Sequence, residues 1–294
     1  MVVERAAIQG PVQEAYDEPV VIKGAILSWP AMQSWSPKAL VDRFGSNEYA
    51  CQIDLPTGVP SEHLSKDYTR RMKLAEFANL MMSASPNAPC YMHQRSITQF
   101  PGLEDDLRFE ELMGTGARQR SVNLWIGSAG TKTSLHFDYQ DGLLAQLYGT
   151  KNLLLAGPRD SRNLYVMGGY IQKSRVDAED PDLRRFPRYA HARILSATIG
   201  PGDAIFIPRS WWHMVRSLEP SISVNQFFGE KLGARELLRK VAEAGPATWV
   251  AVARDFVWHG VLRAKLEGRL YSEAPFGVWF YNQARGYIER RLAG

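Results

Sequence analysis

SVNLWIG (residues 121–127) is the first of seven short apolar runs in the second half of this chain and just before it. The other six are TSLHFD (133–138), LLAQLYG (143–149), NLLLAG (152–157), ARILSATIG (192–200), AIFIP (204–208) and SISVNQFF (221–228). Gly, Pro, Asp and Asn lie between the runs, a pattern typical of short β-strands joined by turns. Many short strands of this kind predict a β-barrel or a β-sandwich.

The region before this strand-rich centre mixes helix and strand patterns. Residues 19–27 predict a strand, and residues 74–82 predict an amphipathic helix. Ser36 followed by Pro37 predicts a helix over 37–44, because serine is a favoured N-cap and proline is favoured at the first helical position. The first third of the chain is therefore predicted to be mixed α/β.

The C-terminal part is predicted to be helical. Three segments with helical patterns each close on glycine, a common helix terminator: 232–245, 247–268 and 276–294. The middle segment carries a wide apolar stripe of Trp249, Val252, Ala253, Phe256, Val257 and Leu266. The stripe packs either on the chain's own barrel or on a second copy in a homodimer, and the sequence leaves both open. We predict three regions: mixed α/β over 1–115, a β core over 116–230 and a helical region over 231–294.

Length and composition restrict the class of protein. The chain has 294 residues, 45% of them hydrophobic, which is enough for a buried core and excludes a disordered or fibrous protein. No apolar run is long enough to span a membrane, and the N-terminus is acidic where a signal peptide would be basic. Lys and Arg exceed Asp and Glu only by 35 to 31, without clustering. We expect a cytoplasmic protein with no membrane or nucleic-acid partner.

The cysteines give no evidence of a metal knuckle or a disulfide framework. Cys51 and Cys90 are the only two, and they stand far apart in the sequence. We predict that both are buried thiols.

A histidine and a carboxylate share one side of a predicted strand. In TSLHFD, strict alternation directs His136 and Asp138 to the same face and Phe137 to the other. His213 follows in a second strand-like run, GDAIFIPRSWWHMV (202–215). Two histidines and one carboxylate on neighbouring strands provide three ligands on one face of an octahedral iron and leave the other positions open. The alternative is that His213 only packs beside Trp211 and Trp212.

Two longer segments resemble a known family. They are NLWIGSAGTKTSLHFDYQDGLLAQLYGTKNLLLAGP (123–158) and PGDAIFIPRSWWHMVRSLEPSISVNQFF (201–228). They are similar to the JmjC and cupin-like Fe(II)- and 2-oxoglutarate-dependent oxygenases, in particular to the branch typified by the asparaginyl hydroxylase factor inhibiting HIF. The resemblance extends upstream to residues 18–45 and to YMHQ (91–94), and covers about 18–230. It implies a mainly β fold with flanking helices around a double-stranded β-helix, also called a jelly roll.

The resemblance also implies roles for individual residues. It makes His136, Asp138 and His213 the iron ligands, and it makes Lys151 the partner of the distal carboxylate of 2-oxoglutarate. A dianion entering a narrow barrel needs a fixed cation, which agrees with that role. Three more residues match groups near the cosubstrate, although strict alternation would turn the first of them away from the metal: Thr133, Tyr91 and Asn225.

The sequence departs from the family pattern on the substrate side. Gly142 stands where relatives often have an asparagine near the cosubstrate, and Gln140 is a candidate for replacing that hydrogen bond. His93 occupies a pocket-facing position that is a glutamine in the asparaginyl hydroxylases, so we expect it to contact the substrate. The reaction type transfers by resemblance, but the substrate does not.

The resemblance therefore predicts a hydroxylase that uses Fe(II), 2-oxoglutarate and O2 on an unactivated C–H bond. A side chain in a peptide or protein is the favoured substrate, and a free amino acid or natural-product intermediate is the alternative. A non-catalytic cupin-type binding module and a cupin metalloenzyme without 2-oxoglutarate are two further hypotheses.

One long polar connection separates two of the predicted strands. It carries eight basic residues (Arg159, Arg162, Lys173, Arg175, Arg184, Arg185, Arg188, Arg193) against five acidic ones (Asp160, Asp177, Glu179, Asp180, Asp182). It is either a solvated loop or, if it covers the barrel mouth, a surface that favours an acidic or carboxylate-bearing partner.

Overall fold

A computed structural model describes residues 3–5, 11–12, 16–55, 68–114, 122–265 and 274–292. These residues form two compact units. The first unit lies within 1–157 and 194–231, and the second lies within 158–193 and 232–294. The three-region division predicted from the sequence stays a prediction.

The first unit contains an eight-stranded jelly roll. Its strands are β6 (Val122–Gly127), β7 (His136–Phe137), β8 (Asp141–Tyr148), β9 (Lys151–Ala156), β12 (Ile194–Ile199), β13 (Ala204–Ile207), β14 (Trp212–Ser217) and β15 (Ser221–Phe228). One sheet has the order β13-β8-β15-β6 and the other the order β7-β14-β9-β12, so most successive strands alternate between the sheets. This is the double-stranded β-helix, and it confirms the predicted fold class.

The N-terminal residues extend one of these sheets at both edges. The added strands are β1 (Val3–Arg5) and β2 (Val20–Ile22) beside β13, and β5 (Tyr91–Ser96), β3 (Glu48–Gln52) and β4 (Thr69–Lys73) beside β6. The predicted strand over 19–27 is wrong beyond Ile22, because the chain turns at Gly24, where φ is +67°.

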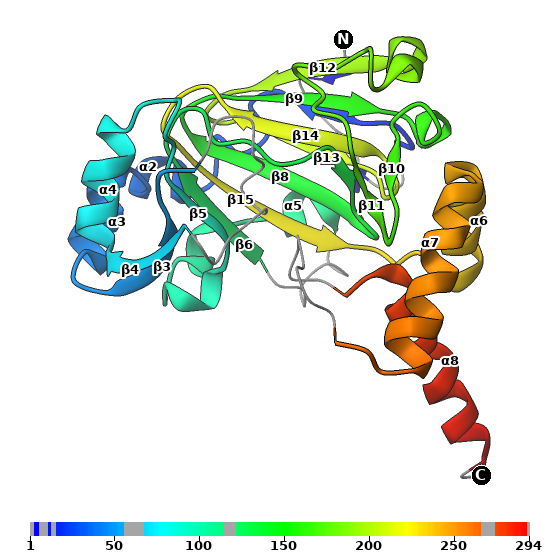
Figure 1. The fold of residues 1–294 in the computed structure, drawn as a ribbon. Helices are drawn as coiled ribbons and strands as arrows, with labels where there is room; N and C mark the ends of the chain where they lie inside the picture. The colour runs from blue at the N-terminus through cyan, green and yellow to red at the C-terminus, as the bar shows by residue number, and fades with distance from the viewer. Residues whose placement is uncertain are drawn as a thin grey trace. The chain divides into compact units, whose positions relative to one another are not determined.

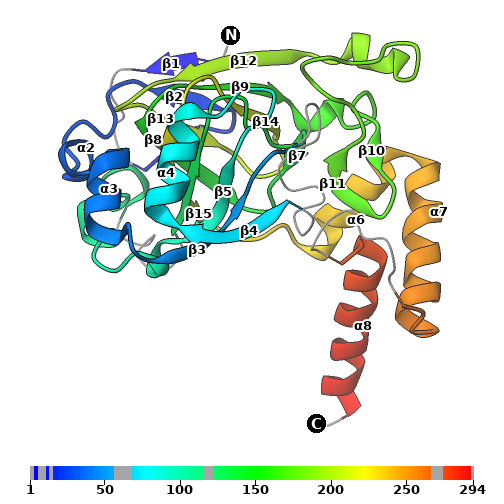
Figure 2. The same ribbon diagram turned by 60° about the vertical axis from the view of Figure 1, so that its left-hand side comes forward.

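Four described helices belong to this unit: α2 (Ala31–Ser34), α3 (Pro37–Phe44), α4 (Leu74–Ser83) and α5 (Glu110–Met113). Both longer helices confirm the prediction, and the Ser36 hydroxyl accepts a hydrogen bond from the Ala39 amide at 3.1 Å as an N-cap. Figures 1 and 2 show α3 and α4 side by side next to β3 and β4.

Two apolar cores can be described among the residues of the first unit that the structure covers. The larger one joins the outer face of the extended sheet to the N-terminal helices, and it includes Phe77, Leu124 and Val224. The smaller one lies between the two sheets of the jelly roll, where Leu155 of β9 and Ile205 of β13 pack in one cluster. Every other residue of β6 and β15 faces the larger core, which leaves the alternate side chains to line the interior of the barrel.

The thiol prediction is confirmed. Cys51 and Cys90 are both buried free thiols. Burial raises the pKa of Cys51 to about 12 and that of Cys90 to about 11, so neither is a ready nucleophile.

The second unit consists of the polar connection and the C-terminal helices. Its elements are η4 (Pro158–Asp160), β10 (Val166–Met167), β11 (Tyr170–Ser174), η5 (Pro187–His191), α6 (Ala234–Ala244), α7 (Pro246–Asp255), the π-helical turn η6 (Phe256–Val261) and α8 (Phe276–Leu292). Figure 1 shows α6, α7 and α8 next to one another, which confirms the helical prediction. Among the described residues, no helix is long and apolar enough to cross a membrane.

The predicted apolar stripe of α7 is only partly buried. Val252 is buried, whereas Trp249 and Val257 are 43% and 49% exposed, and Leu266 lies outside the described residues. The homodimer through these helices stays a prediction.

Candidate active site

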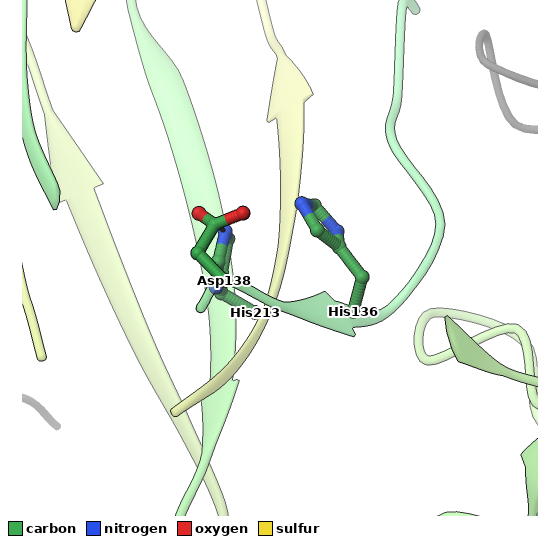
Figure 3. Close-up of side chains that lie close together, drawn as sticks. All are labelled: His136, Asp138 and His213. Carbon is green, nitrogen blue, oxygen red and sulfur yellow. Dashed lines mark ion pairs between the residues drawn. The ribbon is translucent and has the colours of Figure 1, made fainter. Parts of the chain in front are cut away.

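His136, Asp138 and His213 meet in the first unit. His136 lies on β7, Asp138 directly follows that strand, and His213 is the cross-strand partner of His136 on β14. Because directly opposed residues of paired strands face the same side, both imidazoles project together. Their ring centroids are 4.3 Å apart, and His213 Nε2 is 3.4 Å from Asp138 Oδ2. Figure 3 shows the three side chains close together, and one ligand atom from each lies within 4.8 Å of the others.

Backbone carbonyls orient both imidazoles. The Nδ1 atom of His136 lies 2.7 Å from the carbonyl oxygen of Ser134, and that of His213 lies 3.1 Å from the carbonyl oxygen of Trp211. Since a carbonyl only accepts, each Nδ1 carries the proton and donates it, which leaves the Nε2 lone pair for a metal.

The donor set fits a first-row metal such as Fe(II). Two imidazole nitrogens and one carboxylate are the ligands of facial non-haem iron sites with open positions. The site is also accessible from one side, because the Asp138 side chain is 32% exposed while that of His213 is 6% exposed. The arrangement can therefore hold a metal and admit other ligands to it.

Lys151 lies inside the jelly roll without a carboxylate partner. Lys151 is 2% exposed. Its amino group donates a hydrogen bond of 2.8 Å to the hydroxyl of Ser223, which lies on β15 in the opposite sheet. Along β9, Lys151 and Leu155 share a face, and Leu155 pairs with His213 on β14. Lys151 thus projects into the same interior as the metal cluster.

The environment of Lys151 fits an anionic ligand. Among the described residues, the Ser223 hydroxyl is its one hydrogen-bond partner, and no carboxylate forms an ion pair with it. Desolvation by burial lowers the pKa of its amino group to about 7. A dianion such as 2-oxoglutarate would supply the missing counter-charge.

Thr133 lies against β14, the strand that carries His213. The chain bends at Leu135, so strict alternation does not extend from β7 back to Thr133. The Thr133 hydroxyl accepts a hydrogen bond from the Val215 amide at 3.0 Å, which places Thr133 against β14 two residues after His213. Its side chain is buried, and its own hydroxyl proton is available for donation.

Trp125 is a member of this region that the sequence reasoning missed. Its indole nitrogen donates to Asn225 Oδ1 at 2.7 Å, and the His93 ring meets it edge-to-face at 4.8 Å and 89°. Tyr91, which is buried on β5, lies 5.6 Å from His93 and 6.2 Å from Trp125 between ring centroids. The available signal was alternation in SVNLWIG, because Leu124 and Ile126 face the larger core and Trp125 therefore faces the interior.

Gln140 and Gly142 lie at the ends of the strands near the cluster. The Gln140 amide donates to the Gly229 carbonyl at 3.0 Å, so that group connects the segment after β7 to the end of β15. A side chain at Gly142 would meet Phe227 at an ordinary contact distance of 3.5 Å. Sterics therefore do not require glycine at this position.

The fold and the cluster define a cupin-type jelly roll with a His-Asp-His site. Residues 13–233 match the family profile described as "Cupin-like domain", which covers well over half of the chain. The chain belongs to this cupin-like family, in agreement with the resemblance to JmjC proteins. JmjC proteins as a family use Fe(II) and 2-oxoglutarate.

Individual relatives support the same placement. The chain is 31% identical over 215 residues to "Lysine-specific demethylase 8" of Xenopus tropicalis, covering 71% of this chain and 47% of that protein. It is 29% identical over 214 residues to "Lysine-specific demethylase JMJ30" of Arabidopsis thaliana, covering 70% and 49%. It is also 31% identical over 231 residues to "tRNA wybutosine-synthesizing protein 5" of Gallus gallus, covering 72% and 70%.

The match is to part of the demethylases only, because the chain spans about half the length of these relatives. The relatives do not single out the asparaginyl-hydroxylase branch, so that part of the resemblance stays a prediction.

Proposed function

We propose that this chain is an Fe(II)- and 2-oxoglutarate-dependent dioxygenase that hydroxylates an unactivated C–H bond. One observation carries the proposal: the interior that holds the cluster of His136, Asp138 and His213 also holds Lys151, a buried cation with no carboxylate partner. A metal cluster alone would suit many cupins, and the lysine adds a place for a dianionic cosubstrate.

Each residue has a role in this proposal. When bound, Fe(II) supplies the redox chemistry by which O2 is activated while 2-oxoglutarate is converted to succinate and CO2. His136, Asp138 and His213 would hold the metal, and their carbonyl-anchored rings keep the ligand geometry. Lys151 would pair with the distal carboxylate. Leu155, which lies opposite His213, belongs to the apolar core between the two sheets and would keep water away from the metal.

Thr133 and Tyr91 would share the distal carboxylate with the lysine, and Asn225 would donate from its amide group. Trp125 occupies the Asn225 carbonyl oxygen, so the Asn225 NH2 group keeps both hydrogens for other acceptors. In this arrangement the cation recognises the charge of the dicarboxylate, and the neutral hydrogen-bond donors around it fix the orientation of the carboxylate.

We infer that the substrate is a side chain within a peptide or protein, with a free amino acid or natural-product intermediate as the alternative. His93 is half-buried beside Trp125, where an imidazole and an indole give a polar and an apolar surface to a substrate. The relatives' names refer to lysine demethylation and to tRNA wybutosine synthesis, so tRNA belongs in the substrate test.

An anaerobic titration tests the cofactor assignment. Fe(II) with 2-oxoglutarate should give the weak visible charge-transfer band of the chelate, and Lys151→Ala should raise the 2-oxoglutarate concentration needed for it. A non-catalytic binding module predicts no band. A cupin metalloenzyme without 2-oxoglutarate predicts that iron binds but that 2-oxoglutarate produces no band, in the wild type and in Lys151→Ala alike. Either result would reject the proposal.

A second experiment tests the substrate side. Peptide libraries, free amino acids and tRNA are offered separately, succinate is followed, and the product is checked for a mass gain of one oxygen. His93→Ala should lower coupled turnover and leave 2-oxoglutarate binding intact, whereas the exposed His191→Ala serves as the control. Impaired iron or cosubstrate binding in His93→Ala would place His93 with the metal rather than the substrate.

A further inference from the structure

An ordered group of arginines surrounds two aromatic rings in the second unit. Arg175 and Arg185 place their guanidinium groups over the Phe186 ring, 5.7 and 5.1 Å from its centroid. Arg188 lies over the Tyr165 ring at 4.3 Å. The two rings meet edge-to-face at 5.0 Å, so the three arginines form one surface, which we call the stacked-arginine surface. All three arginines are exposed.

Three hydrogen bonds between backbone and side-chain groups or within the backbone hold this surface in place. The Arg188 amide donates to the Tyr165 hydroxyl at 2.9 Å, and Arg188 Nε donates to the Arg162 carbonyl at 3.2 Å. The Arg175 amide donates to the Tyr165 carbonyl at 3.0 Å. A guanidinium that is already stacked and anchored loses less conformational entropy when it binds a ligand than a free surface side chain does.

The positive charge of this surface is not neutralised internally. Across the described part of the chain, Arg175, Arg185 and Arg188 form no ion pair with a carboxylate. The nearby Asp182 accepts from the backbone amides of Arg184 and Arg185, at 3.0 and 3.1 Å, and so caps its own turn. Apart from Arg188 Nε, which donates to the Arg162 carbonyl, the guanidinium N–H groups of these three arginines are therefore available to an external anion.

We propose that the stacked-arginine surface binds an acidic segment of a polypeptide partner. Planar guanidinium groups bind carboxylates through paired hydrogen bonds, and three of them suit a short run of Asp or Glu side chains. Single-stranded RNA fits less well, because its bases need free aromatic faces for stacking and Phe186 is only 5% exposed beneath its arginines. Residues 159–193 also contain eight basic and five acidic residues, and this excess is small for a surface that binds the phosphates of a long nucleic acid.

The test uses the full chain and a short fluorescein-labelled peptide of alternating glutamate and glycine, followed by fluorescence anisotropy at low salt. Replacing Arg175, Arg185 and Arg188 together by Gln should weaken binding about tenfold, as expected for three surface ion pairs. A peptide with glutamine in place of glutamate should not bind. The corresponding triple Arg→Lys variant keeps the charge, loses the planar stack and should lie in between.

The matched control removes the same charge from the same connection. Arg159, Arg162 and Arg193 are exposed, and their guanidinium groups stack on no ring among the described residues. Replacing these three by Gln should change peptide binding less than about threefold, through long-range charge alone. Thermal melting of each variant reports whether the second unit stays folded, and the Lys variant decides the question if the Gln variant unfolds.

Three results would overturn the proposal. Equal weakening by the control triple would mean that net charge acts without an organised surface. Equal binding of the glutamine peptide would exclude carboxylate recognition. Tighter binding of a single-stranded RNA of equal charge than of the glutamate peptide, lost in the Gln triple, would assign the surface to nucleic acid instead. None of these measurements depends on oxygenase activity.

Discussion

Lys151→Met is the substitution that separates stability from function most clearly in this chain. It replaces a buried amine by an apolar side chain of similar length and keeps the packing between β9 and β15. Without cosubstrate, the wild-type amino group is buried with one hydroxyl partner, Ser223. A buried charge without a counter-charge destabilises the folded state. We therefore expect the Met variant to be more stable than the wild type at low pH and to bind 2-oxoglutarate poorly.

The pKa of Lys151 gives the size and sign of the stability effect. Burial lowers that pKa from 10.5 to about 7. Between these values the unfolded chain binds more protons than the folded one, so the stability of the wild type rises with pH in this window. Below pH 7 both states are protonated, and the full penalty is on the order of 5 kcal/mol at 1.36 kcal/mol per pKa unit.

Loss of the donor to Ser223 opposes part of this gain. A buried hydroxyl that loses its partner costs about 1–3 kcal/mol. The net stabilisation of the metal-free Met variant at pH 6 is therefore about 3 kcal/mol, and it should shrink towards pH 10. Urea unfolding of both proteins in the presence of a chelator measures it, with the exposed Lys38→Met as the control.

Cosubstrate binding should show the opposite preference. A dianion binds best to the charged lysine, and only about a tenth of the free protein carries that charge at pH 8. The apparent affinity of Mn(II)-loaded wild type for 2-oxoglutarate should thus fall about tenfold from pH 6 to pH 8. Calorimetry at pH 8 in two buffers of different ionisation enthalpy should detect uptake of nearly one proton, and this uptake should be absent in Lys151→Met.

Two results would refute this reasoning. A Met variant less stable than wild type at pH 6 would mean that the lysine already has a counter-charge in the folded protein. Cosubstrate binding without proton uptake at pH 8 would mean that the amino group keeps its ordinary pKa or does not contact the ligand.

Three more substitutions test the site. Asp138→Ala should abolish metal binding, measured by Mn(II) titration, and should abolish succinate formation. Its circular dichroism spectrum should stay unchanged. Wild-type turnover in this variant would show that Asp138 is not a metal ligand. Thr133→Val should raise the KM for 2-oxoglutarate less than loss of Lys151 does, because a neutral hydrogen bond contributes about 0.5–1.5 kcal/mol and a charged one about 1.5–3 kcal/mol; the reverse order would show that the lysine does not bind the distal carboxylate. Trp125→Phe keeps a ring beside His93 but releases the Asn225 amide, so it should raise the same KM about three- to tenfold with little change in metal affinity; an unchanged KM would exclude this positioning role.

The sequence predicted strands and helices where local patterns are strong. Ser36 and Pro37 indicated the start of α3, and the apolar runs indicated the jelly-roll strands. The pattern failed where the cause is not local. Residues 23–27 are apolar enough for a strand, yet the turn at Gly24 ends β2 after Ile22.

The candidate site was predicted only in part, because some of its contacts are local in the sequence and others join distant strands. Alternation correctly placed His136 and Asp138 on one side, because the two residues belong to one short extended segment. It does not extend to Thr133, because the bend at Leu135 interrupts the extended segment, and the role of Thr133 stays a prediction. Trp125 was missed, since its partners Asn225 and His93 come from other strands.

Local sequence patterns are enough to predict the class of fold, its apolar strands and the residue types of the metal cluster, because strand periodicity and ligand chemistry are local properties. The burial of Lys151 opposite Ser223 without a carboxylate, and the carbonyls that anchor both imidazoles, could be found only in the folded chain. The same holds for the three arginines of the polar connection, which stack on two rings rather than pair with its acids. Burial and partner choice depend on which distant segments the sheets bring together, and that information belongs to pairs of strands rather than to any one stretch of sequence.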